Sequence, residues 1–169
     1  KKLSDIRSDI AHAQAYYKAE RFDDAYRAYA KAMIVFGGTT RDGSEESVKC
    51  LVDEIQLPCL LRLAACKIKL QKNQEMAIAH CDAVLSLCPT SAKAYYRRAQ
   101  ARMQLKEYDL AARDLISAAK LNTGNKAIQQ AWVELKSLQN KTKTSKAVEP
   151  CLWLEFVKGF ALMLRSYFS

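Results

Sequence analysis

Three stretches of this chain share one spacing of small and larger apolar residues, and this recurrence constrains the fold more than any other feature. In each stretch an alanine is followed four positions later by a larger side chain and, three positions after that, by a small or branched one. The triplets are Ala25/Tyr29/Ala32, Ala77/Cys81/Val84 and Ala111/Leu115/Ala118. The second and third triplets lie 34 residues apart, whereas the first and second lie 52 apart. A recurrence of this length predicts stacked helix pairs that bury their apolar faces against one another.

A second small residue precedes each triplet, where the first helix of each pair is expected. These residues are Ala13, Ala64 or Ala65, and Ala99. Small side chains at these places let two antiparallel helices approach closely. A period of 34 residues is that of the tetratricopeptide helix-turn-helix repeat. We therefore predict an all-α solenoid with three such repeats, at about 6–38, 56–91 and 92–125.

The composition agrees with a helical chain, since only five glycines and three prolines occur among the 169 residues. We expect no strands. The extra length between the first two repeats falls mainly in residues 37–58, where Gly-Gly-Thr-Thr and Asp-Gly-Ser indicate a loop. From Ser44 onward the apolar spacing predicts that the next helix begins early, and we interpret the insertion as a solvent loop rather than a site.

A capping helix is predicted after the third repeat, at 126–141, because apolar residues recur there at helical spacing. These residues are Ile128, Trp132, Leu135 and Leu138. Such a helix covers the last apolar face of a solenoid. The repeat domain is therefore expected to span 1–141, followed by a linker at 142–150.

An apolar tail, 151–169, is predicted to form one more helix after Glu149-Pro150. Its stripe contains Trp153, Phe156, Val157, Phe160, Leu164 and Phe168. A membrane span is disfavoured because Glu155, Lys158 and Arg165 interrupt a stretch near the short limit of about 17 residues. Three interpretations stay open: a helix docked on the solenoid, an interfacial membrane helix, or a C-terminus with no selected role. Docking in the chain's own groove is a further variant of the first.

The six cysteines show no Cys-x-x-Cys pair, and several fall on apolar helical faces. We interpret them as reduced small hydrophobes of a cytoplasmic protein, with a nuclear location also open. His12 and His80 are far apart, and neither has a nucleophile and an orienting carboxylate at a recognisable spacing. We therefore expect no metal, no cofactor and no catalysis by this chain.

The net charge of +9, from 27 basic and 18 acidic residues, favours an anionic partner such as an acidic peptide, a nucleic acid or lipid. The only dense cationic cluster is "KAYYRRAQARMQLK", 93–106, in the leading helix of the third repeat. Nucleic-acid binding is the weakest of these interpretations, since the other cations are spread over helices of both orientations. We expect a monomer.

Two segments carry a family resemblance: "LPCLLRLAACKIKL", 57–70, and "AYYRRAQARMQLKEYDLAARDL…NKAIQQ", 94–130. They resemble the tetratricopeptide domain of the large immunophilins, and most of all the forty-kilodalton cyclophilin type. The resemblance implies a co-chaperone module of a peptidyl-prolyl isomerase, whose groove takes the acidic C-terminal tail of heat-shock protein 90, or of heat-shock protein 70. The isomerase domain would precede this chain, and no cyclophilin catalytic motif is found within it.

In that family two carboxylates of the tail are held by a clamp of lysine, asparagine and arginine side chains. Matched motif to motif, the resemblance implies that the third-repeat pair is retained as Lys93 and Arg97, one helical turn apart. The first-repeat lysine falls at Ile10, which has no donor, and its asparagine at Gln14. The second-repeat asparagine falls at Arg62, an added cation that partly replaces the missing lysine.

A partly degenerate clamp is thus expected. Each charge-assisted hydrogen bond that is missing from it should weaken binding about tenfold to a hundredfold, unless Arg62 compensates. Neighbouring Arg98, Arg102 and Lys106 are interpreted as its solvated flanks. The alternative, favoured by Ile10 and the apolar tail, is a scaffold that binds another partner or its own tail without recognising carboxylates.

Overall fold

A computed structural model describes residues 2–38 and 45–142, and all of its regular elements within these ranges are helical. In chain order they are α1 (Lys2–Lys18), α2 (Phe22–Gly37), α3 (Glu45–Leu51), the π-helical segment η2 (Val52–Gln56), α4 (Leu57–Leu70), α5 (Gln74–Leu87), α6 (Ala92–Gln104), α7 (Tyr108–Leu121) and α8 (Lys126–Thr142). The predicted all-α class is confirmed. The linker from 143 and the tail 151–169, including Cys151, lie outside the described residues.

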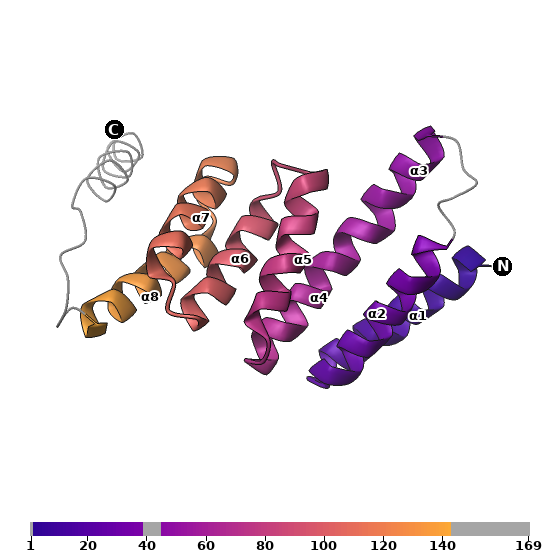
Figure 1. The fold of residues 1–169 in the computed structure, drawn as a ribbon, viewed down its shortest axis with the longest axis horizontal. Coiled ribbons are helices and arrows are strands. Elements are labelled where there is room, and N and C mark those ends of the chain that lie inside the picture. The colour runs from indigo at the N-terminus through magenta and orange to yellow at the C-terminus, as the bar shows by residue number, and fades with distance from the viewer. Residues whose placement is uncertain (1, 39–44, 143–169) are drawn as a thin grey trace.

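Three helix pairs stack in chain order, α1 with α2, α4 with α5 and α6 with α7, and α8 closes the stack against α7 (Figure 1). Each pair is joined by a three-residue turn that holds a left-handed residue other than glycine: Glu20, Gln71 and Asn73, or Lys106. The first and third turns share one conformation, with a single left-handed residue at the middle position, whereas the second has left-handed residues at its first and last positions.

The predicted triplets form the core of the stack. All nine of their residues are buried, with exposed fractions between 0% and 1%, and so are the alanines predicted on the preceding helices. Tyr29 and Leu115 are among the largest fully buried side chains, and each fills the space that its small neighbours leave between adjacent helices. The recurrence read from the sequence therefore identifies the packing seam itself.

The capping helix is present as α8. Ile128, Ala131 and Leu135 are buried against α6 and α7, and Trp132 and Leu138 pack at the edge of the same cluster. Of the helices described here, none is long and apolar enough to cross a bilayer.

The insertion after the first repeat is more helical than its loop-like sequence indicates. Helices α3 and α4 run on through η2 as one long rod, visible in Figure 1, and the N–H of Leu57 donates to the carbonyl of Val52, five residues earlier. Pro58 explains this wide turn, because proline lacks an N–H and its ring collides with the carbonyl four residues earlier in a regular α-helix. The early start predicted from Ser44 is confirmed, since α3 begins at Glu45, and residues 39–44 are not described.

Candidate functional site

Arg97 lies half-buried at the contact between α6 and α4. Its Nη1 donates a hydrogen bond to the backbone carbonyl of Leu61. Two turns further along α6, the Nε2 of Gln104 donates to the carbonyl of Ile68, at 3.2 Å. The two donors are seven residues apart on α6 and the two acceptors seven apart on α4, so both bonds belong to one register between the helices. The guanidinium of Arg97 is therefore held beside α4.

Arg62 follows Leu61 on α4 and brings a second guanidinium to the same place. Its Cζ lies 5.4 Å from the ring centroid of Tyr17 on α1. A guanidinium over an aromatic face is attracted by the negative charge of the ring, which orients an otherwise exposed side chain. Tyr17 carries the contact to α1, so three leading helices meet around Arg62.

We call this surface the cationic face and define it by Ile10, Gln14, Tyr17, Arg62, Lys93 and Arg97. Ile10, Gln14 and Tyr17 are spaced by four and three residues along α1, and Lys93 and Arg97 by four along α6. Residues with these spacings share one side of a helix.

Arg62 lies close enough to Arg97 to influence the ionisation of Arg97. Burial lowers the pKa of Arg97 from its usual value, and the positive charge of Arg62 lowers it further. Burial raises the pKa of Cys66 to about 11, and both arginines act against this rise by favouring the thiolate. The cations therefore flank the same buried thiol.

The positive charges of this face have no carboxylate partner among the described residues. Across 2–38 and 45–142, no ion pair joins Arg62, Lys93 or Arg97 to a carboxylate. Opposite charge is the ordinary partner of a partly buried guanidinium. An uncompensated group of this kind has capacity for an external anion.

The remaining predicted site residues lie on the same helices with fewer contacts. Lys93 and Gln14 are exposed, and neither is joined to the two arginines by a hydrogen bond among the described residues. Ile10 is half-buried and packs against the first core cluster. Its position therefore contributes packing to α1 and no donor to the face.

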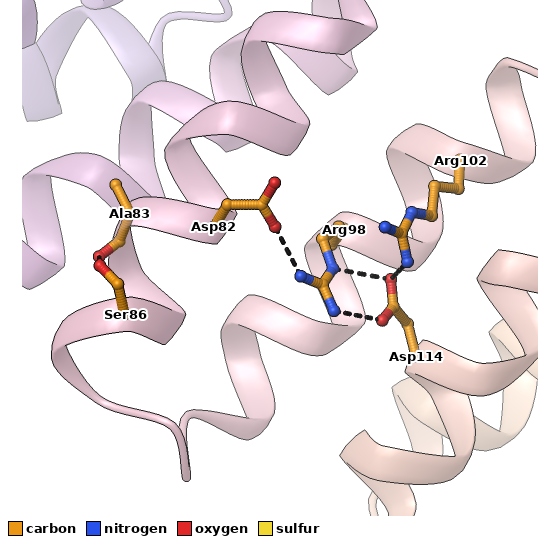
Figure 2. Close-up of polar contacts among 6 residues, drawn as sticks. All are labelled: Asp82, Ala83, Ser86, Arg98, Arg102 and Asp114. Carbon is orange, nitrogen blue, oxygen red and sulfur yellow. Dashed lines mark hydrogen bonds and ion pairs between the residues drawn. The ribbon is translucent and has the colours of Figure 1, made fainter.

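The interpretation of Arg98 and Arg102 as solvated flanks is wrong. Both bind Asp114 of α7, a carboxylate only 3% exposed (Figure 2). Arg98 donates through Nε to Oδ2 at 2.9 Å and through Nη2 to Oδ1 at 2.6 Å, while Arg102 donates through Nη1 to Oδ2 at 2.6 Å. Arg98 also reaches Asp82 of α5, at 2.5 Å. Lys106 is exposed, as predicted.

This group, the Asp114 cluster, ties α5, α6 and α7 together. The bonds to Asp114 are the main cause that raises the pKa of Arg98. One sequence signal was available for it: Asp114 stands three residues after Ala111 and four before Ala118, a charged residue within a buried stripe. Tyr17, the support of Arg62, carried no comparable signal.

Comparison with known proteins places this geometry in context. No family model matches the chain. It is 32% identical over 143 residues to the peptidyl-prolyl cis-trans isomerase FKBP42 of Arabidopsis thaliana, covering 85% of this chain and 38% of the relative. It is 33% identical over 98 residues to the Hsp70/Hsp90 co-chaperone cns1 of Schizosaccharomyces pombe, covering 58% and 24%. The chain thus spans about a third of the length of the curated relatives it matches.

Among solved structures, the C-terminal tetratricopeptide domain of a putative FK506-binding protein of Plasmodium falciparum superposes with a TM-score of 0.74. It is 23% identical, and the match covers 86% of this chain and 95% of that one. The first such domain of Spaghetti (RPAP3), bound to the HSP90 peptide SRMEEVD, gives a TM-score of 0.61 at 20% identity, covering 81% and 92%.

The chain has the fold of a tetratricopeptide-repeat domain. Its similarity to the isomerase relatives named above is to proteins of the FK506-binding type, so the comparisons do not support the expected closeness to the forty-kilodalton cyclophilin. The tetratricopeptide part of that resemblance is confirmed.

Proposed function

We propose that this tetratricopeptide domain is a co-chaperone module whose cationic face binds the acidic C-terminal tail of heat-shock protein 90 or 70. The observation that supports the proposal is a group of three cations on two packed helices, Arg62, Lys93 and Arg97, which have no carboxylate partner within 2–38 and 45–142. Two of them are already oriented, one by the carbonyl of Leu61 and one by the ring of Tyr17.

The chemistry of such a tail suits this face. A peptide that ends in aspartate presents two carboxylates close together, and guanidinium and ammonium groups bind carboxylates through charge-assisted hydrogen bonds. The name of the fission-yeast relative and the peptide bound to the Spaghetti domain, which ends in Glu-Glu-Val-Asp, support a chaperone tail as the ligand. We assign Lys93, Arg97, Arg62 and Gln14 as its donors.

The clamp is proposed to be partly degenerate. Ile10 offers no donor where the resemblance implies a lysine, and a charge-assisted hydrogen bond is worth about 1.5–3 kcal/mol. Arg62 lies next to the carbonyl that anchors Arg97 and replaces part of this loss. Affinity for a chaperone tail is therefore expected in the micromolar range or weaker.

A second candidate is a scaffold that binds a partner without recognising a terminal carboxylate. The packing of Ile10 against the core favours it, because it leaves the α1 side of the face without a cation. Amidating the C-terminus of the peptide separates the two: a clamp loses affinity, and a scaffold does not.

We propose residues 1–141 as the domain, with repeats at about 6–38, 56–91 and 92–125, and a cytoplasmic location. No isomerase activity is proposed for the described residues, which form a repeat domain. Several relatives are named as isomerases, and we propose this activity only for a longer protein that would contain this chain.

The test is calorimetric titration of Met-Glu-Glu-Val-Asp into the parent chain and into Lys93→Ala/Arg97→Ala at two salt concentrations. Micromolar binding that the double variant abolishes is expected, and it should weaken at higher salt. Arg113→Ala is the matched control, because it removes an exposed charge from α7. If the peptide does not bind the parent chain, the chaperone-tail proposal is refuted and the scaffold function remains. Circular dichroism of each variant checks the fold.

A further inference from the structure

The two guanidinium groups of the cationic face lie together at the contact between α4 and α6. Arg97 reaches the carbonyl of Leu61, and Arg62 is the next residue on that helix. Lys93 lies one turn before Arg97 on α6. The side of the face on α1 supplies Ile10 and Gln14, which carry no charge. Whatever anion binds here meets its cations between α4 and α6.

Most other arginines of the described residues pair with a carboxylate, whereas Arg62, Arg97 and the exposed Arg113 have no such pair within 2–38 and 45–142. Arg98 and Arg102 share Asp114, while Arg21 and Arg27 pair with Asp24. Arg62 lies over the ring of Tyr17 and forms no ion pair with a carboxylate of the described residues. Arg97 donates to an uncharged carbonyl. Each guanidinium therefore keeps N–H groups for an external acceptor.

A compact dianion fits this arrangement better than two separate monoanions. A phosphate monoester carries a charge of about −1.5 to −2 at neutral pH and offers three acceptor oxygens around one atom. Arginine forks bind such oxygens two at a time. A terminal aspartate spreads its two charges over two carboxylates, and one of them would fall toward the uncharged α1 side.

We propose that Arg62, Arg97 and Lys93 bind a phosphorylated serine or threonine within an acidic peptide, with no need for a free C-terminus. The inference rests on the proposed function in one respect, that this face binds acidic peptides. The peptide is preferred to free phosphate because Gln14, on the neighbouring helix α1, offers a further exposed donor on the same face. This donor serves a residue next to the phosphorylated one.

Three peptides differing only at their last position test the proposal by calorimetry: Met-Glu-Glu-Val-phosphoserine amide, the same peptide with serine amide, and Met-Glu-Glu-Val-Asp. The phosphoserine amide should bind about tenfold or more tightly than the serine amide. Equal affinities of these two would overturn the proposal. Binding of the phosphoserine peptide without binding of the aspartate peptide would support the phosphoserine proposal and refute the chaperone tail as a ligand. Binding of the aspartate peptide without binding of the phosphoserine peptide would refute the phosphoserine proposal and leave the chaperone tail as a ligand.

Arg62→Asn locates the phosphate, since asparagine leaves an amide at the same position of α4. Arg62 is exposed, so the fold should survive the change. The variant should lose about tenfold in affinity for the phosphoserine peptide and clearly less for Met-Glu-Glu-Val-Asp, because the asparagine amide still donates to a carboxylate. Arg113→Asn should leave both unchanged. Phosphopeptide binding that is insensitive to Arg62→Asn would refute the assignment.

Inorganic phosphate is the last probe, because it carries the same chemistry without a peptide. We expect it to displace the phosphoserine peptide only at millimolar concentration, since it lacks the flanking residues. If it binds as tightly as the phosphopeptide, the site takes a free anion and the peptide part of the proposal is wrong.

Discussion

Replacing Asp114 with alanine removes the carboxylate that Arg98 and Arg102 share between α6 and α7. The side chain of Asp114 is 4% exposed and those of both arginines 17%, so water cannot fully replace the missing acceptor. Removing one partner of a buried charge network costs about 3–5 kcal/mol, because the remaining charges are left without compensation. Arg98 keeps Asp82, which places the expected loss near the lower end, about 3 kcal/mol.

The assay is urea unfolding followed by far-ultraviolet circular dichroism, with the free energy of unfolding extrapolated to water. Asp82→Ala is the matched control, because the side chain of Asp82 is 51% exposed. It should cost no more than about 1 kcal/mol, since Arg98 retains both bonds to Asp114. The triple change Asp114→Leu, Arg98→Met and Arg102→Met, which removes the charges together, should recover most of the loss. A cost below about 1 kcal/mol for Asp114→Ala would refute the claim that this cluster is effectively buried.

Two further predictions concern titratable groups that are buried or half-buried. Burial raises the pKa of Cys81 to about 12 and those of Cys59 and Cys66 to about 11, so native maleimide labelling at pH 8, mapped by mass spectrometry, should spare these three and modify exposed Cys50. Equal labelling of all four would contradict their burial. Burial lowers the pKa of His80, so the unfolded chain binds the proton more readily and stability should fall as pH drops below about 6.5. Thermal unfolding between pH 5 and 7 should show a shallower dependence in His80→Gln, and an unchanged slope would contradict this assignment.

The helix pairs could be predicted because their signal is local and repeats. Alanine at Ala25, Ala77 and Ala111 marks a close helix contact each time, and the structure buries all of them. The helical spacing of Ile128 and Leu135 likewise predicted the capping helix. In these cases burial follows from periodicity alone.

The contacts that give the site its character depend on pairings that periodicity does not encode. Arg98 finds Asp114 sixteen positions away, and Arg97 finds the carbonyl of Leu61 thirty-six positions away. A run of basic residues is typical of a solvated surface, and the sequence does not show which helix packs against it. The prediction that Arg98 is solvated was wrong for this reason. The π-helical turn before Pro58 was not predicted from the sequence either. Helical residues show the same apolar spacing whether each N–H donates to the carbonyl four or five residues earlier.

Arg97 and Gln104 donate to the backbone carbonyls of Leu61 and Ile68. Every residue of a helix has such a carbonyl. A contact made to the main chain does not depend on which side chain the partner position carries. The contact between α4 and α6 should accordingly tolerate apolar exchanges at 61 and 68 that keep the side-chain volume. A proline that breaks α4 at these positions should remove the two hydrogen bonds. These two contacts would therefore form with any α-helix in the place of α4, whereas the bond from Arg98 to Asp82 of α5 depends on the side chain present there.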